Sequence, residues 1–167
     1  MEKYVMALLT VLACLLFAAL AIRAWKSRAA RQSSLFLSPP EELTSKGQPV
    51  AIADAFYVAT TFANNFLERI AAHGLGARGF SQIQVFAEGV LISRIGERDL
   101  AIVRDDLISV SYSQVAIDKA VESDGLMVLS WRAGETMLAS HLRIKDLSSR
   151  SLIFRTLSDL VPGGVKK

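Results

Sequence analysis

Cysteine and histidine are scarce in this chain of 167 residues, which has one cysteine and two histidines. A single cysteine excludes an intramolecular disulfide and any zinc or iron–sulfur site built from several cysteines. Two histidines also supply few ligands for a metal centre. The net charge of +3 is too small to indicate nucleic-acid binding from composition. We therefore expect no metal and no nucleic-acid partner.

Apolar residues are abundant, at 51% of the chain with a mean hydropathy of +0.35. The excess is concentrated between Tyr4 and Ile22, nineteen residues that carry no charge. A helix of that length is roughly 28 Å long at about 1.5 Å per residue, close to the hydrocarbon thickness of a bilayer. Tyr4 and Trp25 are the amphipathic aromatic residues expected at the two membrane interfaces. The sequence therefore predicts a transmembrane anchor over residues 1–25.

Basic residues are distributed unequally about this span. Lys3 alone precedes it, whereas four basic residues follow it closely: Arg23, Lys26, Arg28 and Arg31. The positive-inside rule then predicts a single-pass protein of the cell membrane with its N-terminus outside and its remainder in the cytoplasm. The good helix formers between Arg23 and Ala30 are expected to continue the helix for two turns. The four charges are also expected to meet anionic lipid headgroups.

Two processing signals compete with a retained anchor. Ala19-Leu20-Ala21 fits a small-residue cleavage site, and Val11-Leu12-Ala13-Cys14 faintly resembles a lipobox. The single Lys3 before the span and the basic residues directly after it favour the retained anchor.

Residues 26–50 form a basic juxtamembrane segment followed by a linker rich in proline and serine. Its prolines, at positions 39, 40 and 49, are expected to stop any helix and to leave the chain semi-extended. The apolar tripeptide Leu35-Phe36-Leu37 interrupts this linker. Contact with the membrane interface and contact with the following domain both remain open for it.

Residues 51–161 have the patterning of a mainly β domain, with thirteen basic and thirteen acidic residues from Ile52 onward. A first strand is predicted at 56–61 and a short helix at 64–72 that ends at Gly74. Six further strands are predicted at 83–87, 90–95, 99–103, 107–113, 126–131 and 137–144, separated by Gly, Asp or Glu turns. Apolar residues at helical spacing then predict an amphipathic helix over 146–161. Asp146 or Ser148 is expected to cap this helix, and Pro162-Gly163-Gly164 to end it before a tail over 162–167.

Seven strands and one helix predict an antiparallel sandwich or open barrel with the helix over one open end. Six parts of the chain carry a family resemblance: Tyr57-Val-Ala-Thr-Thr61, Phe66-Leu-Glu-Arg-Ile70, His73-Gly-Leu-Gly76, Glu88-Gly-Val-Leu91, Trp131 and Arg28-Ala-Ala-Arg-Gln32. Together they resemble actinobacterial membrane-anchored proteins with a pleckstrin-homology-like (PH-like) domain, which are often labelled transporters or export proteins. The resemblance implies a seven-stranded PH-like fold with a C-terminal helix, and it identifies no reaction. A single span cannot by itself form a transport path.

Motifs that suggest chemistry are weak in this chain. Gly74-Leu-Gly-Ala-Arg-Gly79 matches a dinucleotide motif in its letters, but the order of elements around it is wrong for a pyrophosphate site. His73 and His141 lie outside any nucleophile or metal motif, and Asp105-Asp106 is expected to be a solvated turn. Trp131 is expected in the core. We therefore predict that the protein is not an enzyme and has no cofactor or small-molecule substrate.

The function predicted from these observations is a membrane-tethered interaction module that recruits a protein partner at the inner membrane. One alternative is a sensor of anionic lipids, and another is an accessory subunit of a transport or export system. The candidate contacts for a lipid or a partner are four arginines of the domain: Arg69, Arg78, Arg94 and Arg98.

Overall fold

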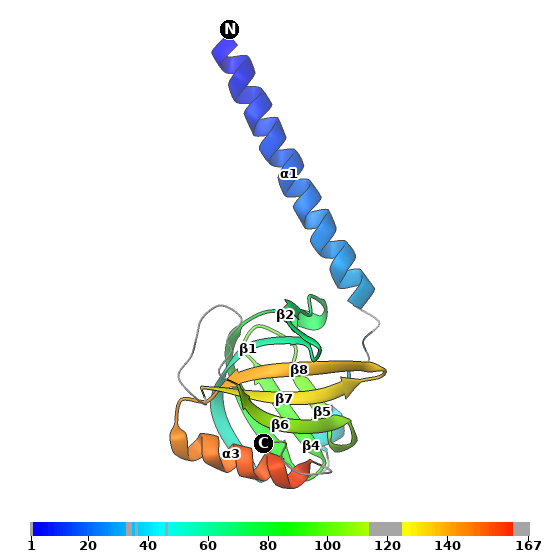
Figure 1. The fold of residues 1–167 in the computed structure, drawn as a ribbon, viewed down its shortest axis with the longest axis vertical. Helices are drawn as coiled ribbons and strands as arrows, with labels where there is room; N and C mark the ends of the chain where they lie inside the picture. The colour runs from blue at the N-terminus through cyan, green and yellow to red at the C-terminus, as the bar shows by residue number, and fades with distance from the viewer. Residues whose placement is uncertain (1, 33–34, 36, 46, 114–124, 162–167) are drawn as a thin grey trace.

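The computed structural model describes residues 2–32, 35, 37–45, 47–113 and 125–161, and it joins one long helix to a β domain (Figure 1). Helix α1, Glu2–Gln32, confirms the expected continuation beyond the apolar span. Its segment Glu2–Ser27 contains an 18-residue stretch with a mean hydropathy of 2.8 and is long enough to cross a membrane, although a signal sequence can have the same length and composition. None of this segment is buried against the domain, which is compatible with a membrane anchor.

The domain is built on one antiparallel sheet, which confirms the predicted mainly β fold. Seven strands follow one another in the order β5-β4-β3-β1-β8-β7-β6, and an additional strand, β2, pairs with β1. The bounds are β1 Ala51–Phe62, β2 Asn65–Arg69, β3 Gly79–Phe86, β4 Gly89–Arg94, β5 Leu100–Val103, β6 Leu107–Ser113, β7 Leu126–Ala133 and β8 Thr136–Arg143.

Strand β1 joins the two halves of the sheet. Its first half pairs with β3, up to Tyr57 opposite Gly79, and its second half pairs with β8, up to Phe62 opposite Leu138. The strand begins five residues before its predicted start. Alanines alternate at the buried positions of this first part of the strand, and alanine is only a weak signal for a β-strand.

Helix α3, Leu147–Leu160, follows β8 and covers the end of the sheet that lies away from α1 (Figure 1). Ile153, Leu157 and Leu160 are its buried residues, as the helical spacing predicts. The Asp146 carboxylate accepts a hydrogen bond from the backbone N–H of Ser149 at 2.7 Å, which confirms Asp146 as the cap. The predicted stop at 162–164 lies outside the described residues.

The helix predicted at 64–72 is wrong. Strand β2 occupies Asn65–Arg69 instead, and only a short 3₁₀ turn, η1 (Ala72–Gly74), follows it. Phe62 and Asn65 pair across a two-residue turn, so the chain folds back on β1 as a hairpin. The helical spacing was misleading because two of its apolar residues, Phe66 and Leu67, are exposed and need no common buried face.

The linker is more ordered than its composition suggests, and the expectation that its prolines exclude a helix is wrong. A single turn, α2 (Glu41–Thr44), starts directly after Pro40, a position at which proline is tolerated. Leu43 on this turn is fully buried against the outer side of β4 and β5, and Ser38 forms a β-bridge with Ala101 of β5. Leu35 packs against the main core. Leu37 does so as well, whereas Phe36 lies outside the described residues.

Candidate interaction site at the anchor-proximal end

A chain of buried hydroxyl groups holds together the strands that carry the candidate site. The Trp131 Nε1–H donates to Ser140 Oγ at 2.9 Å, and Ser140 Oγ lies 2.6 Å from Thr60 Oγ1. Thr60 Oγ1 lies 2.5 Å from the Tyr57 hydroxyl, which donates to the carbonyl of Leu75 at 3.0 Å. Because the indole only donates and the carbonyl only accepts, each hydroxyl in between donates once and accepts once. Burial raises the pKa of Tyr57 to about 12, so its hydroxyl keeps its proton.

Arg94 fastens two loops at this end of the domain, residues 70–78 and 95–99, which we call the anchor-proximal loops. Its guanidinium lies 4.9 Å from the centre of the Tyr57 ring. It donates to the carbonyl of Gly74 at 2.8 Å and to that of Arg98 at 2.9 Å. The side chain is only 7% exposed. Arg94 was expected to be a surface contact, but it is buried and can reach a lipid or partner only by breaking these bonds.

His73 and Gly74 shape the turn that Arg94 holds. Both have a positive φ, 55° and 68°, which favours glycine at the second position. A Cβ at Gly74 would clash with Oε2 of Glu97, so the two loops touch here. The ring of His73 has a buried Nε2 atom with no partner among the described residues. Strand β3 follows this glycine-rich loop, so the loop cannot place a pyrophosphate on a helix N-terminus.

The end of α1 is attached to the same loops. The side-chain carbonyl of Gln32 accepts a hydrogen bond from the backbone N–H of Ala71 at 2.6 Å. Trp25, seven residues earlier on the helix, lines a hollow of about 560 Å³ between α1 and the domain. The other residues of this hollow are Arg69, Ile70, Ala71, Gly74, Gly76, Ala77 and Glu97. Helix α1 and the anchor-proximal loops therefore form one contact region.

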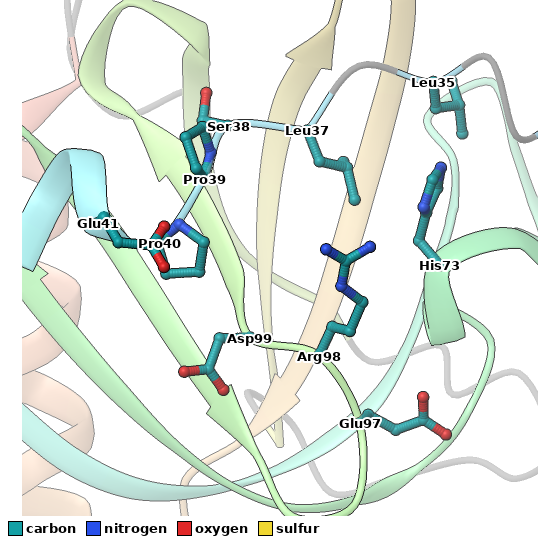
Figure 2. A pocket seen from close by; sticks show the side chains of 10 residues that line it. All are labelled: Leu35, Leu37, Ser38, Pro39, Pro40, Glu41, His73, Glu97, Arg98 and Asp99. Atoms are coloured by element: carbon teal, nitrogen blue, oxygen red, sulfur yellow. The ribbon is translucent and has the colours of Figure 1, made fainter.

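A second hollow, of about 680 Å³, lies between the linker and the anchor-proximal loops (Figure 2). The ring of His73 points toward Leu35, and the guanidinium of Arg98 points toward Leu37. Three carboxylates also line the hollow, those of Glu41, Glu97 and Asp99. Their charge disfavours the binding of an anion such as a lipid phosphate.

The remaining predicted contacts are distributed around this end. Arg69 is half-buried at the end of β2 and lines the hollow beside Trp25, whereas Arg98 lines the hollow of Figure 2. Arg78 is exposed before β3 and lines neither hollow. On α1, Arg23 and Lys26 are exposed. Tyr4 and Trp25 are exposed as well, and the side chains of Arg28 and Arg31 lie outside the described part of the structure.

Sequence reasoning missed a row of apolar side chains on the outer face of the sheet, which we call the outer stripe: the half-buried Phe56 and the exposed Phe80 and Ile95. Phe80 is 68% exposed and its ring packs edge-on against that of Phe56, with 5.7 Å between the ring centres. Ile95 is 79% exposed, and its backbone N–H donates to the carbonyl of Phe80 at 3.2 Å. The period of two in β3 held the missing signal, since it places Phe80 in phase with the solvent-facing Gln82.

Two hollows flank the outer stripe. One, of about 290 Å³, lies toward the start of α3 and has Arg143 and Lys145 on its rim. The other, of about 630 Å³, lies toward β4 and is lined by Phe80, Ile95 and Asp99. Such a row of apolar side chains between concave surfaces is typical of sites at which a protein partner docks.

The titratable groups offer little chemistry at this end. His141 lies on β8 as expected, and burial lowers its pKa, so the ring stays neutral at pH 7. Its Nε2 lies 3.2 Å from Thr61 Oγ1. Trp131 is buried, as predicted. Asp106 belongs to a short 3₁₀ turn, η2 (Arg104–Asp106). Its Oδ1 atom lies 3.8 Å from Nε of Arg132. Within the described residues no group of three or more His, Cys, Asp or Glu side chains is placed to hold a metal ion.

Comparison with known proteins agrees with this architecture. The family described as bacterial PH domain-like matches residues 35–158, well over half of the chain. The fold is thus that of a class of protein whose members are in general non-catalytic interaction modules. The chain belongs to the bacterial PH domain-like family. A search of the curated proteins found no matching relative.

Proposed function

We propose that this protein is a membrane-tethered interaction module that holds a protein partner near the inner leaflet of the cell membrane. The outer stripe carries the proposal, because its three side chains form a contiguous apolar surface on a rigid sheet. Phe56 and Phe80 are already packed against each other, so these two side chains lose little conformational entropy when a partner binds. Complete burial of one such side chain contributes about 1.5–3 kcal/mol.

The position of the stripe supports docking close to the bilayer. Ile95 stands two residues before Glu97, which lines the hollow beside Trp25 of α1. The stripe therefore begins in the anchor-proximal loops and runs across β3 to β1. A retained anchor confines the partner and the module to one surface, which raises their effective concentration without further contacts.

The proposed orientation has the N-terminus outside and the domain in the cytoplasm. The unequal distribution of basic residues about the span supports this orientation. Reporter domains fused to the C-terminus test it, since a reporter that is active only in the cytoplasm is expected to function there. Activity of a periplasmic or extracellular reporter at that position, or loss of the first twenty-one residues from the mature protein, contradicts the orientation.

Site-specific photocrosslinking in intact cells tests the partner site. A photoreactive amino acid replaces Phe80 in the full-length chain, and in a matched control it replaces Leu152, an exposed apolar residue of α3. We expect a discrete crosslinked protein from position 80 and none from position 152. The additional substitution Ile95→Asp should abolish the crosslink, and Leu147→Asp on α3 should leave it unchanged.

Two results contradict the proposed partner site. One is the same set of crosslinked proteins from positions 80 and 152, which indicates random encounters. The other is a crosslink from position 80 to lipid alone, which favours the lipid-sensing alternative.

A further inference from the structure

We propose that strand β2 is a second membrane contact, in which Phe66 and Leu67 insert into the cytoplasmic interface of the bilayer beside α1. This inference rests on the proposed function in one respect, namely that α1 spans a membrane. It concerns residues that play no part in the outer stripe. It also requires no recognition of a particular headgroup.

The first observation is that β2 projects from the domain. Phe66 is 50% exposed and Leu67 is 69% exposed. Consecutive residues of a strand point to opposite faces, so the exposure of both means that neither face of β2 is packed at this point. The Asn65 side chain accepts a hydrogen bond from the Leu67 N–H at 3.3 Å, which stabilises the tip locally. Two large apolar side chains in succession are thus held out into the surroundings.

The second observation is the depth at which β2 lies. Trp25 follows the last residue of the apolar span, Ile22, by less than one helical turn, so in a membrane it lies at the cytoplasmic interface. Trp25 lines the same hollow as Arg69, the last residue of β2. The Gln32 bond to Ala71 fixes the domain to the helix about 10 Å farther along its axis. Figure 1 shows β2 on the side of the domain that faces α1, opposite α3.

The chemistry of β2 suits the membrane interface. Aromatic and leucine side chains partition into the boundary between headgroups and acyl chains, about 5–10 Å below the surface. Arg69 follows the apolar pair and can keep its charge at headgroup level. Glu68 stands between them and is repelled by anionic lipids, so apolar burial and not charge drives the contact. Contact with a neutral bilayer is therefore expected.

Fluorescence quenching in reconstituted full-length protein tests the proposal. Cys14 is the single cysteine, so Leu67→Cys in a Cys14→Ser background introduces one attachment point for a polarity-sensitive fluorophore. Matched variants carry Leu152→Cys on α3, which should face water, and Leu20→Cys in the span. Each is placed in phosphatidylcholine vesicles with a nitroxide on the lipid chain near the headgroup, or with iodide in the water on both sides.

We expect the label at position 67 to lose emission to the lipid-borne nitroxide and to be quenched by iodide at least threefold less than the label at position 152. If position 67 behaves like position 152 while position 20 reports lipid, the β2 contact is wrong and the anchor stands. If position 20 also reports water, the spanning helix itself is wrong. If position 67 reports lipid only after anionic lipid is added, charge attraction replaces the apolar contact and overturns this inference.

Discussion

Replacement of Leu43 by alanine tests whether the linker is an integral part of the domain. Leu43 is fully buried, although it lies in a segment rich in proline and serine, and it packs with Phe86, Leu91 and Ala101. Leu→Ala at fully buried positions costs about 2–5 kcal/mol, and the cost increases with the volume of the cavity that remains. Helix α2 is a single turn at the surface and can move inward to fill part of the cavity. We therefore expect Leu43→Ala to lower the free energy of unfolding by about 2–3 kcal/mol.

The measurement is denaturant unfolding of the full-length chain in detergent. The chain has two tryptophans, so a Trp25→Phe background leaves the buried Trp131 as the reporter of domain unfolding. A loss of 2–3 kcal/mol corresponds to a decrease of roughly 6–12 °C in the thermal midpoint of a domain of this size. Glu42→Ala is the matched control, because Glu42 lies on the same helical turn and is exposed.

The result that refutes this reasoning is a Leu43→Ala variant that matches the Glu42→Ala variant within about 0.5 kcal/mol, the usual scatter of surface substitutions. Residues 35–45 would then be a tether that does not contribute to the stability of the fold. Their contacts with β5, such as the bridge between Ser38 and Ala101, would then contribute nothing measurable to the free energy of unfolding.

Three further predictions concern buried polar groups, each measured by denaturant unfolding. Burial raises the pKa of Tyr57 to about 12 from its ordinary value of 10. Between pH 10 and pH 12 the folded chain therefore retains a proton that the unfolded chain loses. The free energy of unfolding should fall over this range by about 2–3 kcal/mol. Tyr57→Phe should remove this decrease, and a Tyr4→Phe control should retain it. Burial lowers the pKa of His141 in the folded chain below its ordinary value of 6.5. Below pH 6.5 the unfolded chain therefore binds more protons than the folded chain, and the free energy of unfolding should decline as the pH falls. His141→Gln should reduce that decline, and a His73→Gln variant that reduced it equally would contradict the assignment. Arg94→Met leaves the carbonyls of Gly74 and Arg98 without their donor and should cost about 2–3 kcal/mol. An effect no larger than that of Arg98→Met, an exposed neighbour, would exclude the proposed fastening of the loops.

The elements that sequence patterning predicted well are those in which local signals and burial agree. In α3 the apolar face, the Asp146 cap and the length all indicate one helix. The later strands are short apolar runs bounded by turn residues, and most of their residues are buried. The two errors arose where tertiary contacts decide the outcome. The chain at 65–69 pairs with β1 although its apolar residues have helical spacing, and Leu43 is buried although its neighbours have the composition of a linker.

The candidate site was harder to predict for a similar reason. Counting arginines as surface groups placed Arg94 outside, because sequence does not show the three backbone carbonyls that surround its guanidinium. The outer stripe combines residues from β1, from β3 and from the position directly after β4, which only the register of the sheet brings together. Ile95 looks like an ordinary strand residue when read along the chain, and Phe80 precedes the strand predicted at 83–87. Their juxtaposition is a property of strand pairing and not of local pattern.

Helix α1 runs without interruption from the apolar span to Gln32, so the number of residues between them determines how the domain is rotated about the helix axis. Each residue of a helix advances about 1.5 Å and turns about 100°. One residue inserted between Trp25 and Gln32 would therefore rotate the domain by about 100° around the anchor, whereas one inserted at Gly47 would leave its heading unchanged. If a partner docks on the outer stripe as proposed, the insertion between Trp25 and Gln32 would turn that surface through the same angle relative to the partner. The number of residues between the apolar span and Gln32 thus sets the rotation of the domain about the axis of α1.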